Sequence, residues 1–333
     1  MRRALALAER GRGTTRPNPV VGAVVVRRGR VVGEGFHVRA GEPHAEVHAL
    51  RAAGSAARGA TLYVTLEPCD HVGRTGPCTL AILAAGVSRV VVGCRDPNPL
   101  VDGRGLIRLR RAGVAVDLGC LEADCVAAIR AYAVWVQEGR PLVTLKAAAT
   151  LDGCIADGTR RQKRAPVWIT GPAARHAAHE LRAAHDAVLV GAGTVRADDP
   201  RLTVRLGRAH RGHAPLRVVL AGRTGLPRGA RVLDGPTPAI VIPGRPPLRR
   251  TLAALAARGI QSVLVEGGAR VWGAFVAAGL VDRVALFVAP RLLGGGIGIA
   301  GGPGLSVARS LRLGPFAVRA VGDDLLIAAD VLR

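Results

Sequence analysis

The sequence predicts an α/β protein of two domains. Its 333 residues are more than one hydrophobic core usually organises. Runs of strand length that are rich in Val, Leu and Ile alternate with helix-like stretches along most of the chain. A polar stretch that contains glycine and proline, VQEGRPLV (136–143), interrupts this alternation. We therefore expect one domain over residues 1–139 and a second over residues 140–333.

The first domain is expected to follow the order β-β-α-β-α-β, which is typical of a layered α/β sheet. The stretch that precedes it, MRRALALAERGRGTTRPNP (1–19), is expected to form an amphipathic helix. The expected strands are VVGAVVV (20–26), VVGEGF (31–36), TLYVTLE (61–67) and RVVVG (89–93). The expected helices are HAEVHALRAAG (44–54) and CTLAILAAG (78–86), and both end at a glycine. The stretches 105–113 and 114–119 repeat the helix–strand pattern.

The second domain shows a further α/β pattern. Its strand-like runs are LVTLKAAAT (142–150), AVLVGAG (187–193), LRVVLAG (216–222), AIVIP (239–243), SVLVEGG (262–268) and RVALFVAP (283–290). Helical stretches fall between them at 172–184, 248–258 and 270–279. No G-x-G-x-x-G opens a first βα unit, so a Rossmann domain is not predicted.

Composition narrows the class of protein. Hydrophobic residues make up 49% and charged residues 21% of the chain, as in globular proteins. No apolar run reaches the roughly 18 residues of a membrane span. The first residues lack the apolar core of a signal peptide, so we expect a cytoplasmic location and no membrane partner.

The formal net charge is +23, and almost all of the cations are arginines. They are scattered along the chain, and aromatic residues, which would stack on exposed bases, are only 3%. We therefore expect no nucleic acid partner. A basic cleft would suit a phosphorylated small substrate or a dinucleotide.

Two stretches predict a zinc centre. His44 lies in the expected first turn of one helix, Cys69 follows a strand and a proline, and Cys78 begins another helix. Catalytic zinc sites usually take three protein ligands and keep a position for water. Glu46, two residues after His44, suits a proton shuttle. The same order, H-x-E and then a Pro-Cys pair with a second Cys, is typical of zinc nucleobase deaminases.

Structural interpretations compete with this hypothesis for single residues. A lone His-Ala-Glu triplet is common, and a Pro-Cys pair after a strand can be a buried core cysteine. His48 has helical spacing from His44 and is a possible ligand, but a structural or exposed position is the preferred interpretation. The remaining cysteines have no metal-ligand spacing and are expected to be inert: Cys94, Cys120, Cys125 and Cys154.

Residues 1–145 resemble the deaminase half of the bifunctional riboflavin-biosynthesis deaminase/reductase. The matching runs are TRPNPVVGAVVV, GEGFHVRAGEPHAEVHAL, YVTLEPCDHVGRTGPC and DPNPLVDGRG. The resemblance implies a cytidine-deaminase-like three-layer fold and zinc-hydroxide deamination of a ribosylaminopyrimidine 5′-phosphate. It implies His44, Cys69 and Cys78 as ligands of one Zn²⁺ and Glu46 as the catalytic shuttle. It also implies substrate contacts at Asn18, His37, His71 and Arg74.

The second domain resembles the reductase half of the same family, which is similar in fold to dihydrofolate reductase. The matching runs include LKAAATLDG, WITG, HELRAAHDAVLVGAGTVRADDPRLTVR, VEGGARVWGAF and APRLLGG. The resemblance implies that NADPH reduces the ribosyl group to ribityl. The implied NADPH contacts are Ala148, Trp168, Thr194, Asp198, Gly268, Ala269, Arg270, Val271, Trp272, Gly273 and Ala274. The implied substrate contacts are Lys146, Arg182, Leu202, Arg205 and Glu266.

Two departures from the family pattern keep alternatives open. Pro166 stands where relatives carry a serine that touches substrate, and proline offers neither a hydroxyl nor an amide donor. Ala221-Gly222 stands where Asp-Ser is usual. One alternative is therefore a deaminase with an impaired or altered reductase domain, and another is an RNA-acting deaminase. Because relatives generally assemble, we also expect a homo-oligomer.

Overall fold

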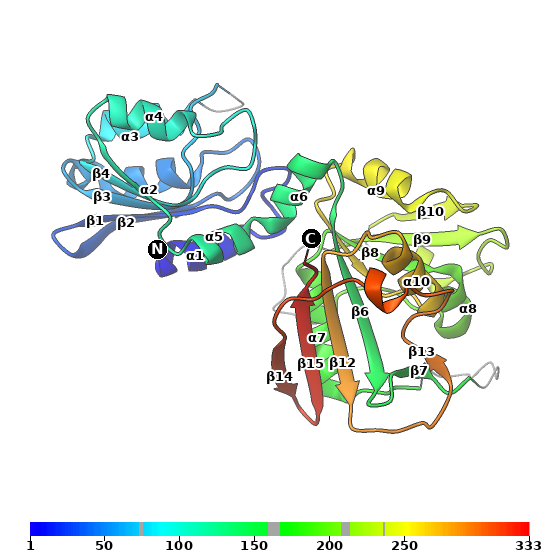
Figure 1. Cartoon of the computed structure of the whole chain (residues 1–333). Coiled ribbons are helices and arrows are strands. Elements are labelled where there is room, and N and C mark those ends of the chain that lie inside the picture. Colours follow the sequence, from blue (N-terminus) through cyan, green and yellow to red (C-terminus); the bar gives the residue numbers. More distant parts are fainter. Residues whose placement is uncertain (73–75, 159–166, 208–213, 236, 333) are drawn as a thin grey trace. The chain divides into compact units, whose positions relative to one another are not determined.

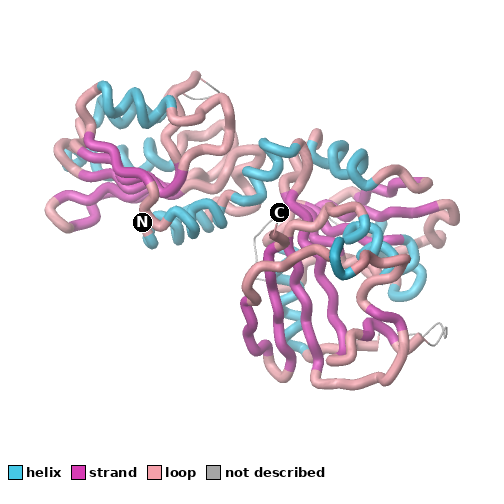
Figure 2. The backbone as a smooth tube through the Cα atoms, viewed as in Figure 1, coloured by secondary structure: helices cyan, strands magenta, loops and turns pink. Residues whose placement is uncertain are grey.

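The chain divides into two compact units, Met1–Gly139 and Arg140–Arg333, which are described separately (Figure 1). The computed structural model describes residues 1–72, 76–158, 167–207, 214–235 and 237–332. Both units are α/β, with helices laid on a central sheet (Figure 2). Among the helices described, none is long and apolar enough to cross a membrane.

The first unit is built on a five-stranded sheet of order β2-β1-β3-β4-β5. Its strands are β1 (Gly22–Arg27), β2 (Arg30–Phe36), β3 (Thr61–Leu66), β4 (Arg89–Cys94) and β5 (Ala115–Leu118). Strand β1 runs antiparallel to β2 and β3, whereas β3, β4 and β5 are parallel. The carboxyl ends of β3 and β4 therefore lie side by side, and the loops that follow them can share one site.

Helices cover both faces of this sheet (Figure 1). On one face lie α2 (Ala45–Ala53), α3 (Cys78–Ala85) and α4 (Arg104–Arg111), over the main apolar cluster. On the other lie α1 (Arg2–Glu9) and α5 (Glu122–Ala128). A Cβ added to Gly35 would lie 2.5 Å from the backbone oxygen of Ala45, so glycine in β2 allows α2 to lie directly on the sheet.

The helices of this unit differ from the expectation in two respects. The helix expected within residues 1–19 ends at Glu9, because glycines at 11 and 13 and proline at 17 do not sustain helical backbone. Helices α5 and α6 (Arg130–Glu138) were not predicted. Tertiary packing stabilises them, as with Cys125 of α5 in the apolar cluster beside α1 and with the buried Tyr132 of α6.

The second unit contains an eight-stranded sheet of order β10-β9-β8-β11-β6-β12-β15-β14. Its strands are β6 (Leu142–Thr150), β8 (Ala187–Gly191), β9 (Leu216–Gly222), β10 (Ala239–Pro243), β11 (Ser262–Val265), β12 (Arg283–Ala289), β14 (Ala317–Val321) and β15 (Asp324–Asp330). The six strands from β10 to β12 are parallel, and β15 and β14 continue antiparallel. A small ladder pairs β7 (Cys154–Ala156) with β13 (Ile297–Gly298).

Within the described ranges of this unit, four α-helices cover the sheet. They are α7 (Pro172–Ala183), α8 (Ala192–Asp198), α9 (Leu248–Ala256) and α10 (Ala269–Ala277). Helices α9 and α10 pack on the largest apolar cluster, while α7 and α8 contribute to clusters built on the alternate side chains of the strands. The strand expected over 187–193 ends at Gly191, because residues 192–198 form α8. The hairpin β14–β15 was not predicted.

Candidate functional site

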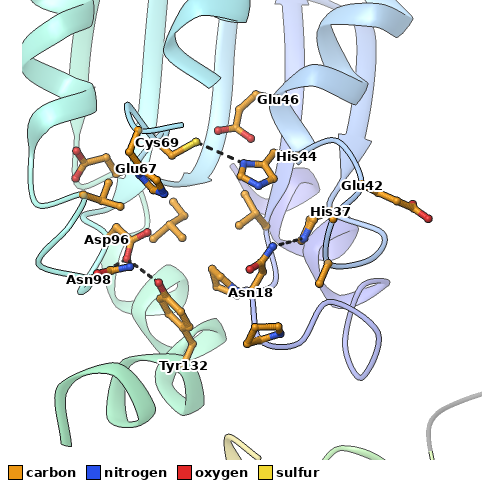
Figure 3. A pocket seen from close by; sticks show the side chains of 18 residues that line it. Asn18, His37, Glu42, His44, Glu46, Glu67, Cys69, Asp96, Asn98 and Tyr132 are labelled. Carbon is orange, nitrogen blue, oxygen red and sulfur yellow. Dashed lines mark hydrogen bonds between the residues drawn. The ribbon is translucent and has the colours of Figure 1, made fainter. Parts of the chain in front are cut away.

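Three metal-binding side chains meet at the carboxyl end of β3. His44 is the N-cap of α2, one position before the helical turn in which it was expected, Cys69 lies in the loop after β3, and Cys78 is the first residue of α3. Their ligand atoms all lie within 4.8 Å of one another. His44 Nδ1 is 3.2 Å from Cys78 Sγ. It is 3.6 Å from Cys69 Sγ, the pair drawn in Figure 3. One imidazole and two sulfurs form a donor set that zinc accepts.

The sulfur of Cys69 is held in a setting that favours a thiolate. Hydrogen bonding from Cys78 and from His44 lowers the pKa of Cys69 to about 4, against the burial that would raise it. The backbone N–H of Cys78, at the start of α3, contributes at 3.5 Å. Because the thiolate and not the thiol is the metal ligand, the favoured form of Cys69 is the one that binds a metal cation.

Glu46 lies beside this cluster and is almost completely buried, with 3% of its surface exposed. Burial raises the pKa of its carboxyl to about 6, although the neighbouring His44 partly offsets the effect. A carboxyl with a pKa close to neutrality can both take and return a proton. In Figure 3 the Glu46 side chain points toward His44 and Cys69.

A cavity of about 270 Å³ opens in front of these residues and contains three of the four expected substrate contacts, Asn18, His37 and His71. Asn18 Nδ2 donates a hydrogen bond to His37 Nε2 at 3.0 Å, and His37 Nδ1 donates to the carbonyl of Pro43 at 3.2 Å. Burial lowers the pKa of His37, which favours this neutral form. The fourth expected contact, Arg74, lies outside the described residues.

The opposite wall of the cavity holds residues that were not predicted: Glu67, Asp96, Asn98 and Tyr132 (Figure 3). Asp96 Oδ1 accepts hydrogen bonds from the backbone N–H of Asn98 at 2.9 Å and from the Tyr132 hydroxyl at 3.3 Å. Burial raises the pKa of Asp96 to about 6. A signal for Asp96 and Asn98 was present, because DPNP begins two residues after the end of β4, the strand that pairs with β3. Tyr132 had none, since it lies on the unpredicted helix α6.

The remaining candidate ligands from the sequence, His48 and the other four cysteines, lie apart from the metal-binding group. Within the described residues, His44, Cys69 and Cys78 form the one group of this kind. The half-buried His48 has a buried Nε2 without a hydrogen-bond partner among the described atoms. Cys94, Cys125 and Cys154 are buried and Cys120 is half-buried, and all are free thiols.

In the second unit, the structure brings Lys146, Arg182 and Glu266 together. Arg182 donates to both carboxylate oxygens of Glu266, through Nε at 2.5 Å and NH2 at 2.8 Å, and Lys146 Nζ lies 3.5 Å from Oε2. Burial alone would raise the pKa of Glu266, but the two cations lower it to about 2. Arg182 NH1 also donates to the carbonyl of Thr203 at 3.2 Å. Three hydrogen-bonding nitrogens of Arg182 thus have protein partners already.

The remaining expected substrate contacts, Leu202 and Arg205, flank Thr203. The Leu202 side chain is only 4% exposed, in an apolar cluster, and its backbone has a positive φ of 53°. Because a leucine side chain has no polar atom, any polar contact from Leu202 comes from its backbone. The backbone N–H and the Nε of Arg205 both lie 3.3 Å from ring nitrogens of His179, a neighbour that was not predicted.

The expected cofactor residues gather around the turns after β8 and β11, with exceptions. Thr194 Oγ1 accepts a hydrogen bond from the backbone N–H of Gly268 at 2.9 Å. Trp272 is buried in the core and donates through Nε1 to the carbonyl of Lys146 at 3.2 Å. Ala269, Arg270, Val271, Gly273 and Ala274 lie on the first two turns of α10.

Other expected cofactor contacts lie on separate elements. Ala148 belongs to β6, Asp198 ends α8, and Trp168 is 52% exposed with its ring 5.0 Å from the Arg175 guanidinium. Of the two departures from the family pattern, Pro166 lies outside the described residues. Ala221 is buried at the end of β9, and the Gly222 carbonyl accepts a hydrogen bond from Gly244.

Comparisons with known proteins identify both units. The family model described as the cytidine and deoxycytidylate deaminase zinc-binding region matches residues 1–94, and the model of the RibD C-terminal domain matches residues 141–327. The riboflavin biosynthesis protein RibD of Aquifex aeolicus is 42% identical, over 98% of this chain and 96% of that protein. The RibD of Escherichia coli is 40% identical, over 98% and 97% respectively.

Solved structures agree with this match. RibD of Acinetobacter baumannii is 39% identical and superimposes with a TM-score of 0.89, over 100% of this chain and 98% of that one. A Thermotoga maritima diaminohydroxyphosphoribosylaminopyrimidine deaminase/5-amino-6-(5-phosphoribosylamino)uracil reductase is 38% identical, with a TM-score of 0.89 over 100% and 97%. The predicted fold class is confirmed. The chain belongs to the RibD family of riboflavin-biosynthesis proteins and unites a zinc-dependent deaminase with a nicotinamide-dependent reductase.

Proposed function

We propose that the chain carries out two consecutive steps on one substrate. The first unit deaminates 2,5-diamino-6-ribosylamino-4(3H)-pyrimidinone 5′-phosphate. The second unit reduces the ribosyl group of the product with NADPH, which yields 5-amino-6-ribitylaminouracil 5′-phosphate. The observation that carries this proposal is the cluster of His44, Cys69 and Cys78 beside the buried Glu46, at the wall of a cavity. Neither the RNA-acting alternative nor an impaired reductase gains support from the family matches.

In the deaminase step, His44, Cys69 and Cys78 would hold zinc, which supplies an activated water when bound. Glu46 would carry a proton from the attacking water to the leaving amine, and its buried carboxyl, with a pKa raised to about 6, suits both uptake and release. The hydrogen bond between Asn18 and the neutral His37 fixes both side chains, and these side chains then orient the pyrimidine. Asp96, on the opposite wall, accepts hydrogen bonds from donor groups of the substrate.

In the reductase step, the nicotinamide cofactor supplies the hydride when bound, so the protein's work is binding and orientation. Lys146 and Arg182 share the single carboxylate of Glu266, so the group keeps a net charge of +1, which suits an anionic substrate. Arg205, which lies beside His179, is suited to the substrate phosphate. The backbone N–H groups in the first turn of α10 suit a cofactor phosphate.

The proposal is tested by measuring the two half-reactions on the purified full chain. Ammonia release from the pyrimidine phosphate should not need a nicotinamide cofactor, and oxidation of NADPH should need the deaminated product. Bound zinc should approach one ion per chain. Absence of ammonia release from the zinc-loaded protein would contradict the proposed substrate, and a preference for NADH would contradict the proposed cofactor.

We also propose that the protein forms a homo-oligomer through the hairpin β14–β15. Val318 is 56% and Leu325 43% exposed, and their registers place them on the same face of this hairpin. Edge strands with exposed apolar side chains are favoured sites of association. Val318→Glu should therefore lower the mass measured by sedimentation, whereas a monomeric wild-type chain would contradict the proposal. The expected cytoplasmic location and the absence of a nucleic acid partner stay predictions.

A further inference from the structure

Helix α4 lies against the loop that carries Cys69, behind the metal-binding cluster. The contact begins at Glu67, whose Oε2 accepts a hydrogen bond from the backbone N–H of Gly103 at 3.1 Å. Gly103 is the N-cap of α4, so the Glu67 carboxylate lies at the positive end of this helix. Glu67 is 3% exposed, which keeps this interaction out of bulk water.

The next residue of the loop touches the backbone of the helix. A Cβ added to Gly105 would lie 1.9 Å from the carbonyl oxygen of Pro68. This carbonyl belongs to the peptide bond that leads directly into Cys69. Because the opposing atom is backbone, a side chain at residue 105 would have to move the ligand loop itself or shift the helix.

The residue after Cys69 completes the contact. Asp70 Oδ1 accepts hydrogen bonds from Arg108 NH1 at 3.0 Å and from Thr79 Oγ1 at 2.5 Å. Thr79 follows Cys78, and its backbone N–H donates to the carbonyl of Cys69 at 3.3 Å. One carboxylate therefore connects the Cys69 loop both to α4 and to the helix that begins with Cys78.

We propose that α4 is the template that sets the separation of the two sulfur ligands, with Gly105 and Arg108 as positioning residues for the metal centre. These two residues are three apart and share one face of the helix. Ligands that are held in place from outside cannot relax when one metal bond opens, so the metal is released slowly. Outer contacts of this kind typically change metal affinity by about 10–100-fold. The inference rests on the proposed zinc site.

The sharpest test is Gly105→Ala in the full chain. Alanine in place of a helical glycine ordinarily stabilises a helix. Here we expect the opposite for the metal centre: zinc release to an excess of a chelator, followed with a zinc-sensitive dye, should be about 10-fold faster or more. Circular dichroism and melting of the zinc-free proteins separate this effect from a loss of folding.

Arg108→Gln is a milder test, because Arg108 is partly exposed and its removal leaves the helix intact. It should speed zinc release by a smaller factor, and Arg108→Lys should restore part of the loss. The matched control is Arg111→Gln, which removes an exposed arginine from the same helix and should release zinc at the wild-type rate. If Gly105→Ala does not fold, the three substitutions at Arg108 and Arg111 decide the question.

Faster release from the Gly105 and Arg108 variants, but not from the Arg111 variant, supports the inference. Release at the wild-type rate from a zinc-loaded Arg108→Gln protein and a folded Gly105→Ala protein overturns it and leaves the proposed function untouched. A wild-type chain that binds no zinc at all overturns the proposed metal centre, and the inference falls with it.

Discussion

Each unit contains a buried glutamate at its site, and the pKa values of the two carboxyls are shifted in opposite directions. Glu46, in the first unit, is 3% exposed, and its pKa is raised to about 6. Glu266, in the second, has a side chain that is 8% exposed, and its pKa is lowered to about 2. Burial acts in the same direction on both. The partners differ: Glu46 adjoins His44 and two cysteine sulfurs, whereas Glu266 adjoins Arg182 and Lys146.

The difference shows how one residue type serves two chemistries in one chain. In the zinc-free chain, a buried carboxyl that contacts neither arginine nor lysine keeps a pKa near neutrality and can exchange protons. A buried carboxylate between two cations stays ionised and acts as a fixed anchor for them. We therefore expect substitution of Glu46 to affect catalysis, and substitution of Glu266 to affect folding as well.

The largest expected effect is that of Glu46→Gln. Glutamine keeps the size of the side chain but cannot carry the proton, so ammonia release should fall by about 10²–10⁴-fold. Zinc content and the reductase rate should stay at their wild-type values. Glu42→Gln is a matched control, because Glu42 lines the same cavity but is exposed. Deaminase activity that survives in the Glu46 variant would remove this residue from the reaction.

The next effect is that of Glu266→Gln on stability. The substitution leaves Arg182 and Lys146 as buried cations without their counter-charge, which typically costs about 3–5 kcal/mol. Denaturant unfolding should show a weakened second unit and an unchanged first unit. Glu180→Gln, an exposed substitution on α7, is the control. Equal free energies of unfolding for the Glu266 and Glu180 variants would show that the ion pairs of Glu266 contribute no net stability.

The effect of Glu266 should depend on pH. Its folded-state pKa of about 2 is below the ordinary value of 4.5, so ionisation stabilises the folded unit. This contribution is fully present above the ordinary pKa and is lost as the pH falls from there through about 2. The difference in stability between the wild type and Glu266→Gln should therefore shrink between these two values. A difference that is independent of pH would exclude the carboxylate charge as its cause.

The two sites also differ in how far the sequence predicts them. The ligands of the first site lie in two neighbouring stretches of sequence, His44 with Glu46 and then Cys69 with Cys78, and the two stretches together predict a metal centre. Arg182 and Glu266 are separated by 84 residues, and only the adjacency of parallel strands brings them together. Before the structure, both could be nominated only from a family resemblance. Their ion pair follows from no local pattern.

The parts of the fold that were missed share a physical cause. Tertiary packing stabilises helices α5 and α6 and the hairpin β14–β15 more than local propensity does. Tyr132 was missed together with α6. By contrast, Asp96 could have been found, since residues after neighbouring parallel strands lie at one edge of a sheet.

Asp96 extends the comparison to a third buried acid, which is 9% exposed. Its folded-state pKa of about 6 is above the ordinary 3.8, so its ionised form destabilises the folded unit at higher pH. Asp96→Asn should therefore stabilise the first unit on the order of 1–3 kcal/mol at alkaline pH. The gain should shrink as the pH falls through the folded pKa of about 6 and be lost below the ordinary 3.8. Thermal melts of both proteins across this range check the prediction, and destabilisation at alkaline pH would contradict it.

The smallest expected effect concerns a neutral hydrogen bond of the second site. Thr194→Val keeps the shape of the side chain but removes the oxygen that accepts from the Gly268 N–H, at a cost of about 1 kcal/mol. Because Gly268 is the N-cap of α10, the turn proposed to hold the cofactor should loosen, and NADPH affinity should fall several-fold while ammonia release is unchanged. Thr194→Ser retains the acceptor and should bind NADPH like the wild type. Equal titration curves for the Val and Ser variants would show that this hydrogen bond does not shape the cofactor site, in contrast to the charged contacts of Glu266.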